Sequence, residues 1–295
     1  MSLHLIHRRQ LLNLGITAAT TSAIVNNDLR AQDNAPPPLR IIDTNVSLFQ
    51  WPFRRLPLDD TDALIAKLRA LGITQAWAGS FEGLLHRDIS AVNRRLAEAC
   101  QQRKELVPIG SVNPELPDWE KDLRRCFEDH NMPGIRLHPN YHGYTLNDQR
   151  FARLLELATE AGGFVQLATT MEDTRTQHPM VRVADVDLTP LPTVMSQVAG
   201  ARVQLLNYRP NVSQLNKLTK TPGLYFDTAR VEATDGVPQL LKLAPSGRVL
   251  FGTHAPQLVP EAAIIRVNES GLLDSGALSA IFSENAKQFM ETTHA

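Results

Sequence analysis

The chain has 295 residues, of which 43% are hydrophobic and 21% are charged, and this composition is that of a soluble globular protein. Its 30 basic and 31 acidic residues give a net charge of −1, which excludes a broad basic face and argues against nucleic-acid binding. The two cysteines, Cys100 and Cys126, exclude a disulfide scaffold and a cysteine-rich zinc site, and we interpret both as core thiols.

The first 38 residues differ in character from the rest of the chain. Arg8 and Arg9 precede a weakly apolar run of small residues, which is the layout of an export signal and resembles a twin-arginine signal. The run is too short and too rich in threonine to span a bilayer. Residues 33–38 end in three prolines and read as a stiff linker. We expect residues 1–38 to direct export to the periplasm, with a cytoplasmic protein as the alternative.

Residues 39–291 are expected to form one domain in which strands and helices alternate. The apolar runs typical of buried strands are Arg40–Leu48, Gln75–Gly79, Leu106–Ser111, Gly134–His138, Phe164–Ala168, Ala201–Leu206, Gly223–Phe226 and Arg248–Gly252. The helical stretches are Asp60–Leu71, Asp88–Lys104, Asp118–His130, Asp148–Ala161, Leu191–Ala199, Val212–Lys220, Asp235–Leu243, Pro260–Val267 and Ser275–Met290. This alternation predicts parallel strands joined by right-handed crossovers, and eight such units predict a (β/α)8 TIM barrel of the α/β class. A doubly wound sheet is the alternative, but no Gly-x-Gly-x-x-Gly follows the first strand.

Polar residues gather where the predicted strands end, which is the face of a barrel that carries catalytic groups. Asp43, Asn45 and Ser47 alternate along the first strand and therefore share one face. Later strand ends supply Arg136, His138, His142, Glu172, Arg175, His178, Asn207, Asp227 and His254. Each residue also has a structural interpretation: Asp227 as a helix cap, His142 as a solvated loop residue, and residues 172–178 as a surface loop with local ion pairs.

Arg136 has the most specific chemistry of these residues. A guanidinium inside a barrel needs a carboxylate partner or an anionic ligand, because an unpaired buried charge is very costly. Two interpretations remain open. Arg136 binds a substrate carboxylate or phosphate, or it pairs with Asp43 or Glu172 and orders the barrel mouth.

Four motifs resemble one family. The sequence Ile-Ile-Asp-Thr-Asn-Val-Ser at residues 41–47, Gly-Ile-Arg-Leu-His-Pro at 134–139, Leu-Phe-Gly-Thr-His-Ala-Pro at 250–256 and Asn-Ala-Lys at 285–287 are similar to motifs of the amidohydrolase superfamily. The resemblance is to its amidohydrolase-related branch of decarboxylases and lactonases, and it extends from Leu39 to Met290. It implies a TIM barrel, a small carboxylated substrate and a homodimer.

The metal ligands of that family do not carry over. In chain order, the matching positions hold Asn45, Ser47, Ala168 or Thr169, Asn207 and His254. Amide and hydroxyl oxygens are poor zinc ligands, so we expect no divalent metal and no other cofactor. A metal site assembled from His138, His142, His178 and His254 is the alternative.

Three functions are compatible with these residues. The first, which we favour, is a metal-independent hydrolase of a small carboxylated lactone or ester, with His254 as general base and Arg136 as anion clamp. The second is a non-catalytic protein that binds a small carboxylated ligand. The third is a metal-dependent hydrolase or decarboxylase with rearranged ligands.

The sequence thus assigns two groups of site residues. The catalytic group is His254, His138 and Asp43. The substrate-binding group is Arg136, Asn45, His142, Glu172, Arg175, His178, Asn207 and Asp227, with Asn45 and Asn207 donating to the substrate carbonyl.

Overall fold

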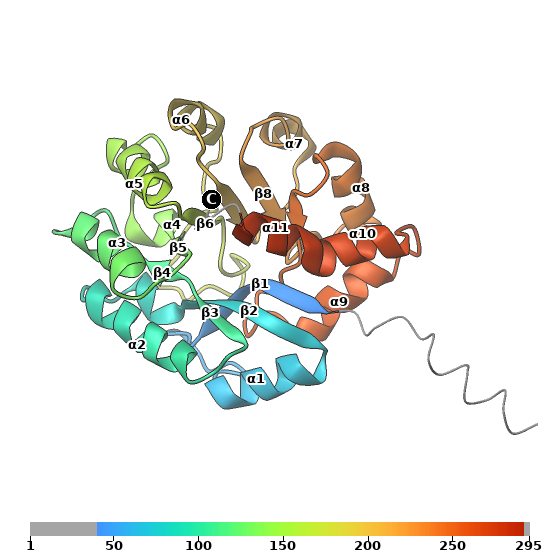
Figure 1. The fold of residues 1–295 in the computed structure, drawn as a ribbon, viewed down its shortest axis with the longest axis horizontal. Helices are drawn as coiled ribbons and strands as arrows, with labels where there is room; N and C mark the ends of the chain where they lie inside the picture. The colour runs from blue at the N-terminus through green and yellow to red at the C-terminus, as the bar shows by residue number, and fades with distance from the viewer. Residues whose placement is uncertain (1–39, 292–295) are drawn as a thin grey trace, which may run out of the picture. The chain divides into compact units, whose positions relative to one another are not determined.

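Parallel strands surrounded by helices form a closed barrel in the computed structural model, which describes residues 40–291 (Figure 1). The strands are β1 (Ile41–Leu48), β2 (Ile73–Ser80), β3 (Leu106–Pro108), β4 (Gly110–Ser111), β5 (Gly134–Leu137), β6 (Phe164–Ala168), β7 (Val203–Leu206), β8 (Leu224–Asp227) and β9 (Val249–Leu250). Because β3 and β4 are two parts of the third barrel strand, the order is that of a (β/α)8 TIM barrel, as predicted. The leader and linker predicted for residues 1–38 lie outside the described residues.

The ring of strands closes through backbone contacts between β1 and the segment that begins with β9. The Thr44 amide donates to the Phe251 carbonyl at 2.9 Å, and Val46 forms a parallel bridge with Ala255. On the other side, Ile109 lies between β3 and β4, and its amide donates to the Ala78 carbonyl of β2 at 2.8 Å. Each predicted apolar run overlaps an observed strand.

Helices cover the outside of the barrel (Figure 1). They are α1 (Thr61–Ala70), η1 (Phe81–Leu84), α2 (Ile89–Gln101), α3 (Trp119–Glu128), α4 (Pro139–His142), α5 (Gln149–Glu160), α6 (Leu191–Gln197), α7 (Val212–Leu218), α8 (Gly236–Leu243), α9 (Pro260–Asn268), α10 (Ser275–Ser279), η2 (Ala280–Glu284) and α11 (Asn285–Glu291). The predicted helix at 275–290 is interrupted because η2 is a π-helical turn, which inserts a residue into the helical repeat. None of the described helices is long and apolar enough to cross a membrane.

Sequence features explain where the helices begin and which face they bury. The Asp60 carboxylate accepts a hydrogen bond from the Ala63 amide at 2.9 Å and caps α1. Leu64 and Leu68 lie one turn apart on that helix, and both are buried against the barrel. This pairing of a polar cap with an apolar stripe fixes the helix on the outside of the sheet.

The inside of the barrel holds a polar layer where an apolar one is usual. The Gln166 side chain donates to the Thr44 carbonyl at 2.7 Å and to the Gln204 side chain at 2.9 Å. Gln204 in turn donates to the Thr44 hydroxyl at 2.7 Å. All three residues are fully buried, and their hydrogen bonds satisfy the polar atoms that burial would otherwise leave unpaired. This layer forms the floor of the barrel mouth.

Candidate functional site

Strand ends bring Asn45, Asn207 and Asp227 together at the carboxyl-terminal face of the barrel. The Asn45 side-chain amide donates to Asn207 Oδ1 at 2.8 Å and to Asp227 Oδ2 at 2.6 Å. The Asn207 backbone amide donates to Asp227 Oδ1 at 3.1 Å, and the Asn207 side chain donates to the Thr170 carbonyl at 2.8 Å. Each of the three residues is 1% exposed. Both amide hydrogens of Asn45 are therefore used within the protein.

Two of the site residues have a left-handed backbone. Asn207 has φ 58° and His254 has φ 57°. Asparagine tolerates this region, but histidine adopts it less readily, and such conformations cluster at functional sites. The His254 amide donates to the Asn45 carbonyl at 2.9 Å, so the strained residue is fixed directly onto β1.

Asp43 connects β1 to the segment after β9. Its Oδ1 accepts hydrogen bonds from the Asn45 and Thr253 amides, both at 3.0 Å, and its Oδ2 accepts one from the Thr253 hydroxyl at 2.5 Å. Burial raises the pKa of Asp43 to about 7, and burial likewise raises the pKa of Asp227 to about 6. The mouth thus contains two fully buried carboxyl groups that hold protons far above the usual range.

Three histidines surround the same region with buried ring nitrogens. The Nε2 atoms of His254 and His142 lie 2.8 Å and 3.0 Å from the carbonyls of Met171 and Gly83, so each Nε2 carries the proton and each Nδ1 has a lone pair. The Nδ1 atoms of both residues and of His138 are buried without a hydrogen-bond partner in the protein. The rings of His138 and His142 are 6.0 Å apart.

Burial keeps these imidazoles neutral. It lowers the pKa of His254 to about 3 and that of His142 to about 4, and it places the pKa of His138 well below 6.5. Neutral imidazoles with a free Nδ1 accept hydrogen bonds or protons. Since buried polar atoms normally have partners, these nitrogens are points at which a bound molecule can hydrogen-bond.

Arg136 lies below this cluster, inside the barrel. Its guanidinium donates to Gln166 at 2.9 Å, to the carbonyls of Val46 and Trp77 at 2.9 Å and 3.3 Å, and to the Ser47 hydroxyl at 3.1 Å. A Cβ on Gly79 would lie 2.7 Å from Nη1, so only glycine leaves room for the guanidinium. Neither Asp43 nor Glu172 makes a hydrogen bond to Arg136. Its role as an anion clamp remains a prediction.

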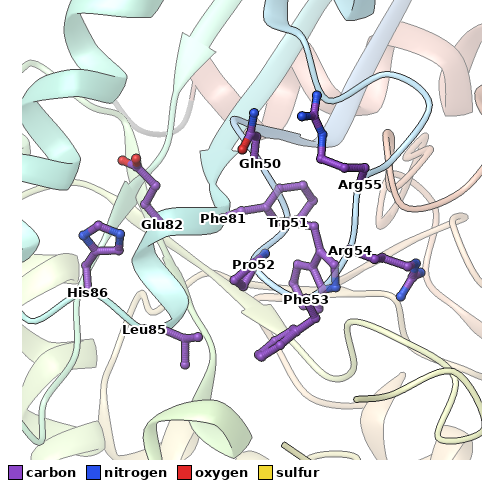
Figure 2. A pocket seen from close by; sticks show the side chains of 10 residues that line it. All are labelled: Gln50, Trp51, Pro52, Phe53, Arg54, Arg55, Phe81, Glu82, Leu85 and His86. Carbon is purple, nitrogen blue, oxygen red and sulfur yellow. The ribbon is translucent and has the colours of Figure 1, made fainter.

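The loop from β1 to α1 covers the mouth, and we call residues 49–56 the cover segment (Figure 2). Trp51, 2% exposed, packs with its ring 5.1 Å from Phe81 and 6.2 Å from Tyr141. Arg54 forms an ion pair with the buried Glu172 and a 3.3 Å hydrogen bond to Gln257. These contacts join the cover segment to the loops that follow β2, β5, β6 and β9.

A cavity of about 760 Å³ lies between the cover segment and η1, as Figure 2 shows. Its lining residues are Gln50, Trp51, Pro52, Phe53, Arg54, Arg55, Phe81, Glu82, Leu85 and His86. Aromatic rings and cationic groups line it together. This combination suits an aromatic molecule that carries a negative charge.

The remaining predicted residues lie at different places around the mouth. Arg175 is exposed and bonded to Asp173 at 2.9 Å, so it lies apart from the buried cluster. The ring of His178 stacks on that of Phe53 in the cover segment, with 5.9 Å between the ring centroids. Sequence reasoning missed the cover segment, although the aromatic Trp51-Pro52-Phe53 run directly after the first strand was a signal for it.

The model of the amidohydrolase family matches residues 43–290. The chain belongs to this family. Solved structures with its fold include the 5-carboxyvanillate decarboxylase of Novosphingobium aromaticivorans, at 14% identity and a TM-score of 0.67, covering 86% of this chain and 96% of that one. A dihydroxybenzoic acid decarboxylase from Polaromonas has 12% identity and a TM-score of 0.67, and the match covers 86% of this chain and 98% of that one. No curated protein sequence matches the chain.

A third structure similar to this amidohydrolase is a 2,6-dihydroxybenzoate decarboxylase from Rhizobium, with 12% identity and a TM-score of 0.64. The match covers 85% of this chain and 98% of that one. At these identities the likeness shows the fold, and the family match makes the chain an amidohydrolase-related TIM-barrel enzyme.

The expectation of no metal cofactor is wrong for this family. The Novosphingobium and Polaromonas decarboxylases were crystallised with bound manganese. The expectation rested on the amide and hydroxyl oxygens at the positions that match the family ligands, which are poor ligands for zinc. In residues 40–291, however, no three His, Cys, Asp or Glu side chains are grouped so that they could hold a metal ion. The residues as placed do not fit the neighbours' metal, and we derive no catalytic step through it.

Proposed function

We propose that this amidohydrolase decarboxylates a small aromatic carboxylic acid at the covered barrel mouth. The observation that carries the proposal is the Asp227 carboxyl, which is fully buried and whose pKa burial raises to about 6. Such a group is about half protonated at pH 6, where an ordinary aspartate is almost fully ionised. The aromatic side chains of the cavity at the cover segment suit an aromatic ring.

The balance of the reaction is simple. The Asp227 carboxyl gives its proton to the ring carbon that bears the substrate carboxylate, and a C–H bond forms there. The bond between the ring and the carboxylate then breaks, its electron pair restores the aromatic ring, and CO2 leaves. Asp227 regains a proton from water. Enclosure of the site favours this step because the charged carboxylate becomes neutral CO2.

The occupied hydrogen-bond donors favour decarboxylation over hydrolysis. Hydrolysis builds negative charge on a carbonyl oxygen, which needs free donors aimed at it. Asn45 has used both amide hydrogens on Asn207 and Asp227, and Arg136 donates to four protein acceptors. Decarboxylation needs a proton donor instead, and the buried Asp227 carboxyl supplies it.

One observation keeps hydrolysis of a lactone or ester as the second candidate. His254 Nε2 donates to the Met171 carbonyl, which orients the ring and leaves the Nδ1 lone pair as a buried base. A water molecule at Nδ1 would then be the nucleophile. The two candidates differ in the bond that breaks, so products separate them.

The test is a panel of hydroxybenzoates labelled with 13C in the carboxyl group, assayed beside a panel of lactones. Because the fold neighbours hold manganese, each assay is run with added manganese and after chelation. We expect labelled CO2 from at least one hydroxybenzoate, and a loss on the order of 10²–10⁴-fold in Asp227→Asn.

The matched control is Asp187→Asn, which changes a surface aspartate bonded to the Thr189 amide and should keep full activity. Ring opening of lactones without CO2 release, abolished by His254→Asn, would replace decarboxylation with hydrolysis. CO2 release that Asp227→Asn leaves unchanged would contradict the assigned proton donor.

A further inference from the structure

A second cavity, of about 290 Å³, lies off the barrel axis between the loops that follow β7 and β8. Its outer wall comes from α7 and α8, which are neighbours in the helical layer (Figure 1). Leu215 of α7 and Leu240 of α8 face it, and Arg209 and Arg230 are supplied by the two loops. None of the cluster residues Asn45, Asn207, Asp227 or His254 lines this cavity.

Arg230 is the unusual residue of the cavity. It is 6% exposed, and its Nε is fully buried without a hydrogen-bond partner. Within residues 40–291 its side chain makes no hydrogen bond and no ion pair; burial lowers its pKa, and the more distant charges of Glu232, Asp173 and Asp185 offset part of that effect. Arg136, the other buried arginine of the barrel, donates to four protein acceptors. A buried guanidinium without a partner is costly in free energy, and an anion that binds to it removes that cost.

The surroundings of Arg230 define what this anion can be. Arg209 is held by Asp185 at 3.0 Å and adds positive charge on the same side. Glu232 is the acidic residue of the lining, and it is exposed to solvent, where its charge is screened. Leu215, Val231 and Leu240 are buried and offer a hydrocarbon wall.

We propose that this cavity binds a small organic monocarboxylate, with its carboxylate on the Arg230 guanidinium and its hydrocarbon part against Leu215, Val231 and Leu240. The planar guanidinium matches a carboxylate in a two-pronged hydrogen-bonded pair. The volume admits a chain of a few carbons, and the leucine and valine walls favour apolar atoms. The mouth cluster does not line this cavity, although the charge of Arg230 reaches His254 and contributes to lowering its pKa after burial and alongside Arg136.

The experiment titrates the full chain with acetate, butyrate and hexanoate and measures binding by calorimetry and by the shift in melting temperature. Affinity should rise about fourfold for each added CH2, the factor that corresponds to about 0.8 kcal/mol of burial. Arg230→Met should lower hexanoate affinity at least tenfold. Without ligand, its melting temperature should not fall, because the substitution removes an unpaired buried charge.

Three variants serve as controls. Arg175→Met removes an exposed arginine bonded to Asp173 and should leave hexanoate binding unchanged. Glu232→Gln removes the acidic group of the lining and should tighten binding. His254→Asn changes the barrel mouth and should bind hexanoate as the unmodified chain does.

Three results would overturn the proposal. Equal loss of binding in Arg230→Met and His254→Asn would place the anion at the barrel mouth. Stabilisation by inorganic phosphate as strong as that by hexanoate would rule out an organic monocarboxylate as the ligand class. A marked fall in the melting temperature of unliganded Arg230→Met would show that Arg230 supports the fold.

Discussion

Asp43 is fully buried, and its raised pKa links the stability of the fold to pH. Burial raises the pKa to about 7, although hydrogen bonds from Asn45 and Thr253 favour the charged form. An unfolded aspartate ionises near pH 4, so between about pH 4 and pH 7 the folded chain binds more protons than the unfolded chain. Stability contributed by this group is therefore present below pH 4 and is lost as pH rises towards 7.

We expect Asp43→Asn to flatten the decline in stability between pH 5 and pH 7. One such group contributes a slope of up to about 1.4 kcal/mol per pH unit. The measurement is urea denaturation at half-unit steps of pH. Asp187→Asn, on the surface, should keep the slope of the unmodified chain. If the free energy of unfolding falls with pH equally in Asp43→Asn and in the unmodified chain, Asp43 does not cause the decline.

At the scale of residues, the sequence predicts where a side chain lies better than it predicts which groups form hydrogen bonds with it. The alternation of Asp43, Asn45 and Ser47 predicts one shared face; the structure buries all three, and the register of β1 shifts between Asp43 and Val46. The partners of Arg136 are backbone carbonyls and a glutamine from other strands, which no sequence pattern indicates. Arg175 and Arg230 look alike in sequence, and only the packing of α7 and α8 makes one exposed and the other buried.

One ion pair of the cover segment reaches a buried carboxylate. Arg54, whose side chain is 41% exposed, reaches the buried Glu172, and Trp51 of the same loop is 2% exposed. Because the cluster of site residues is buried, we expect the cover segment to move when a molecule enters the mouth. Removal of Arg54 leaves the Glu172 carboxylate buried without its partner, which favours the open arrangement.

Arg54→Ala should therefore expose Trp51 to solvent. The measurement is acrylamide quenching of fluorescence in a Trp119→Phe background, where the other tryptophan, Trp77, is fully buried. Quenching should increase several-fold. Arg55→Ala is the matched control, because Arg55 is 75% exposed and its partner Asp59 lies within the same loop. Equal quenching in the two variants would mean that the Arg54 ion pair does not hold the cover segment.

At the scale of elements, apolar runs and helical periods are sufficient to locate the barrel strands. Phe164–Ala168 is predicted and observed with the same ends, and the other runs differ by a few residues. The α4 turn and the interruption at η2 are not predictable, because they arise from contacts with the barrel rather than from local periodicity. The cover segment is irregular, and its course is set by its contacts with four other loops.

The last helix, α11, closes the barrel on the face where its strands begin. Phe289 of α11 packs 4.8 Å from Phe164 and 5.9 Å from Trp77, and both rings belong to barrel strands. Its ring also lies 4.4 Å from Tyr225, near the start of β8. These contacts join the end of the chain to three strands that are distant in sequence, so the barrel and its last helix should unfold together.

Phe289→Ala tests this coupling. The side chain is 1% exposed, and truncation of a buried phenylalanine costs about 3–5 kcal/mol through lost contacts and the cavity left behind. We expect that loss in urea denaturation, with a single transition seen by both circular dichroism and tryptophan fluorescence. Lys287→Ala, on the exposed face of the same helix, should change stability by less than about 0.5 kcal/mol. If α11 instead melts alone, the two probes will separate, with fluorescence of Trp77 changing before the helical signal of the barrel is lost.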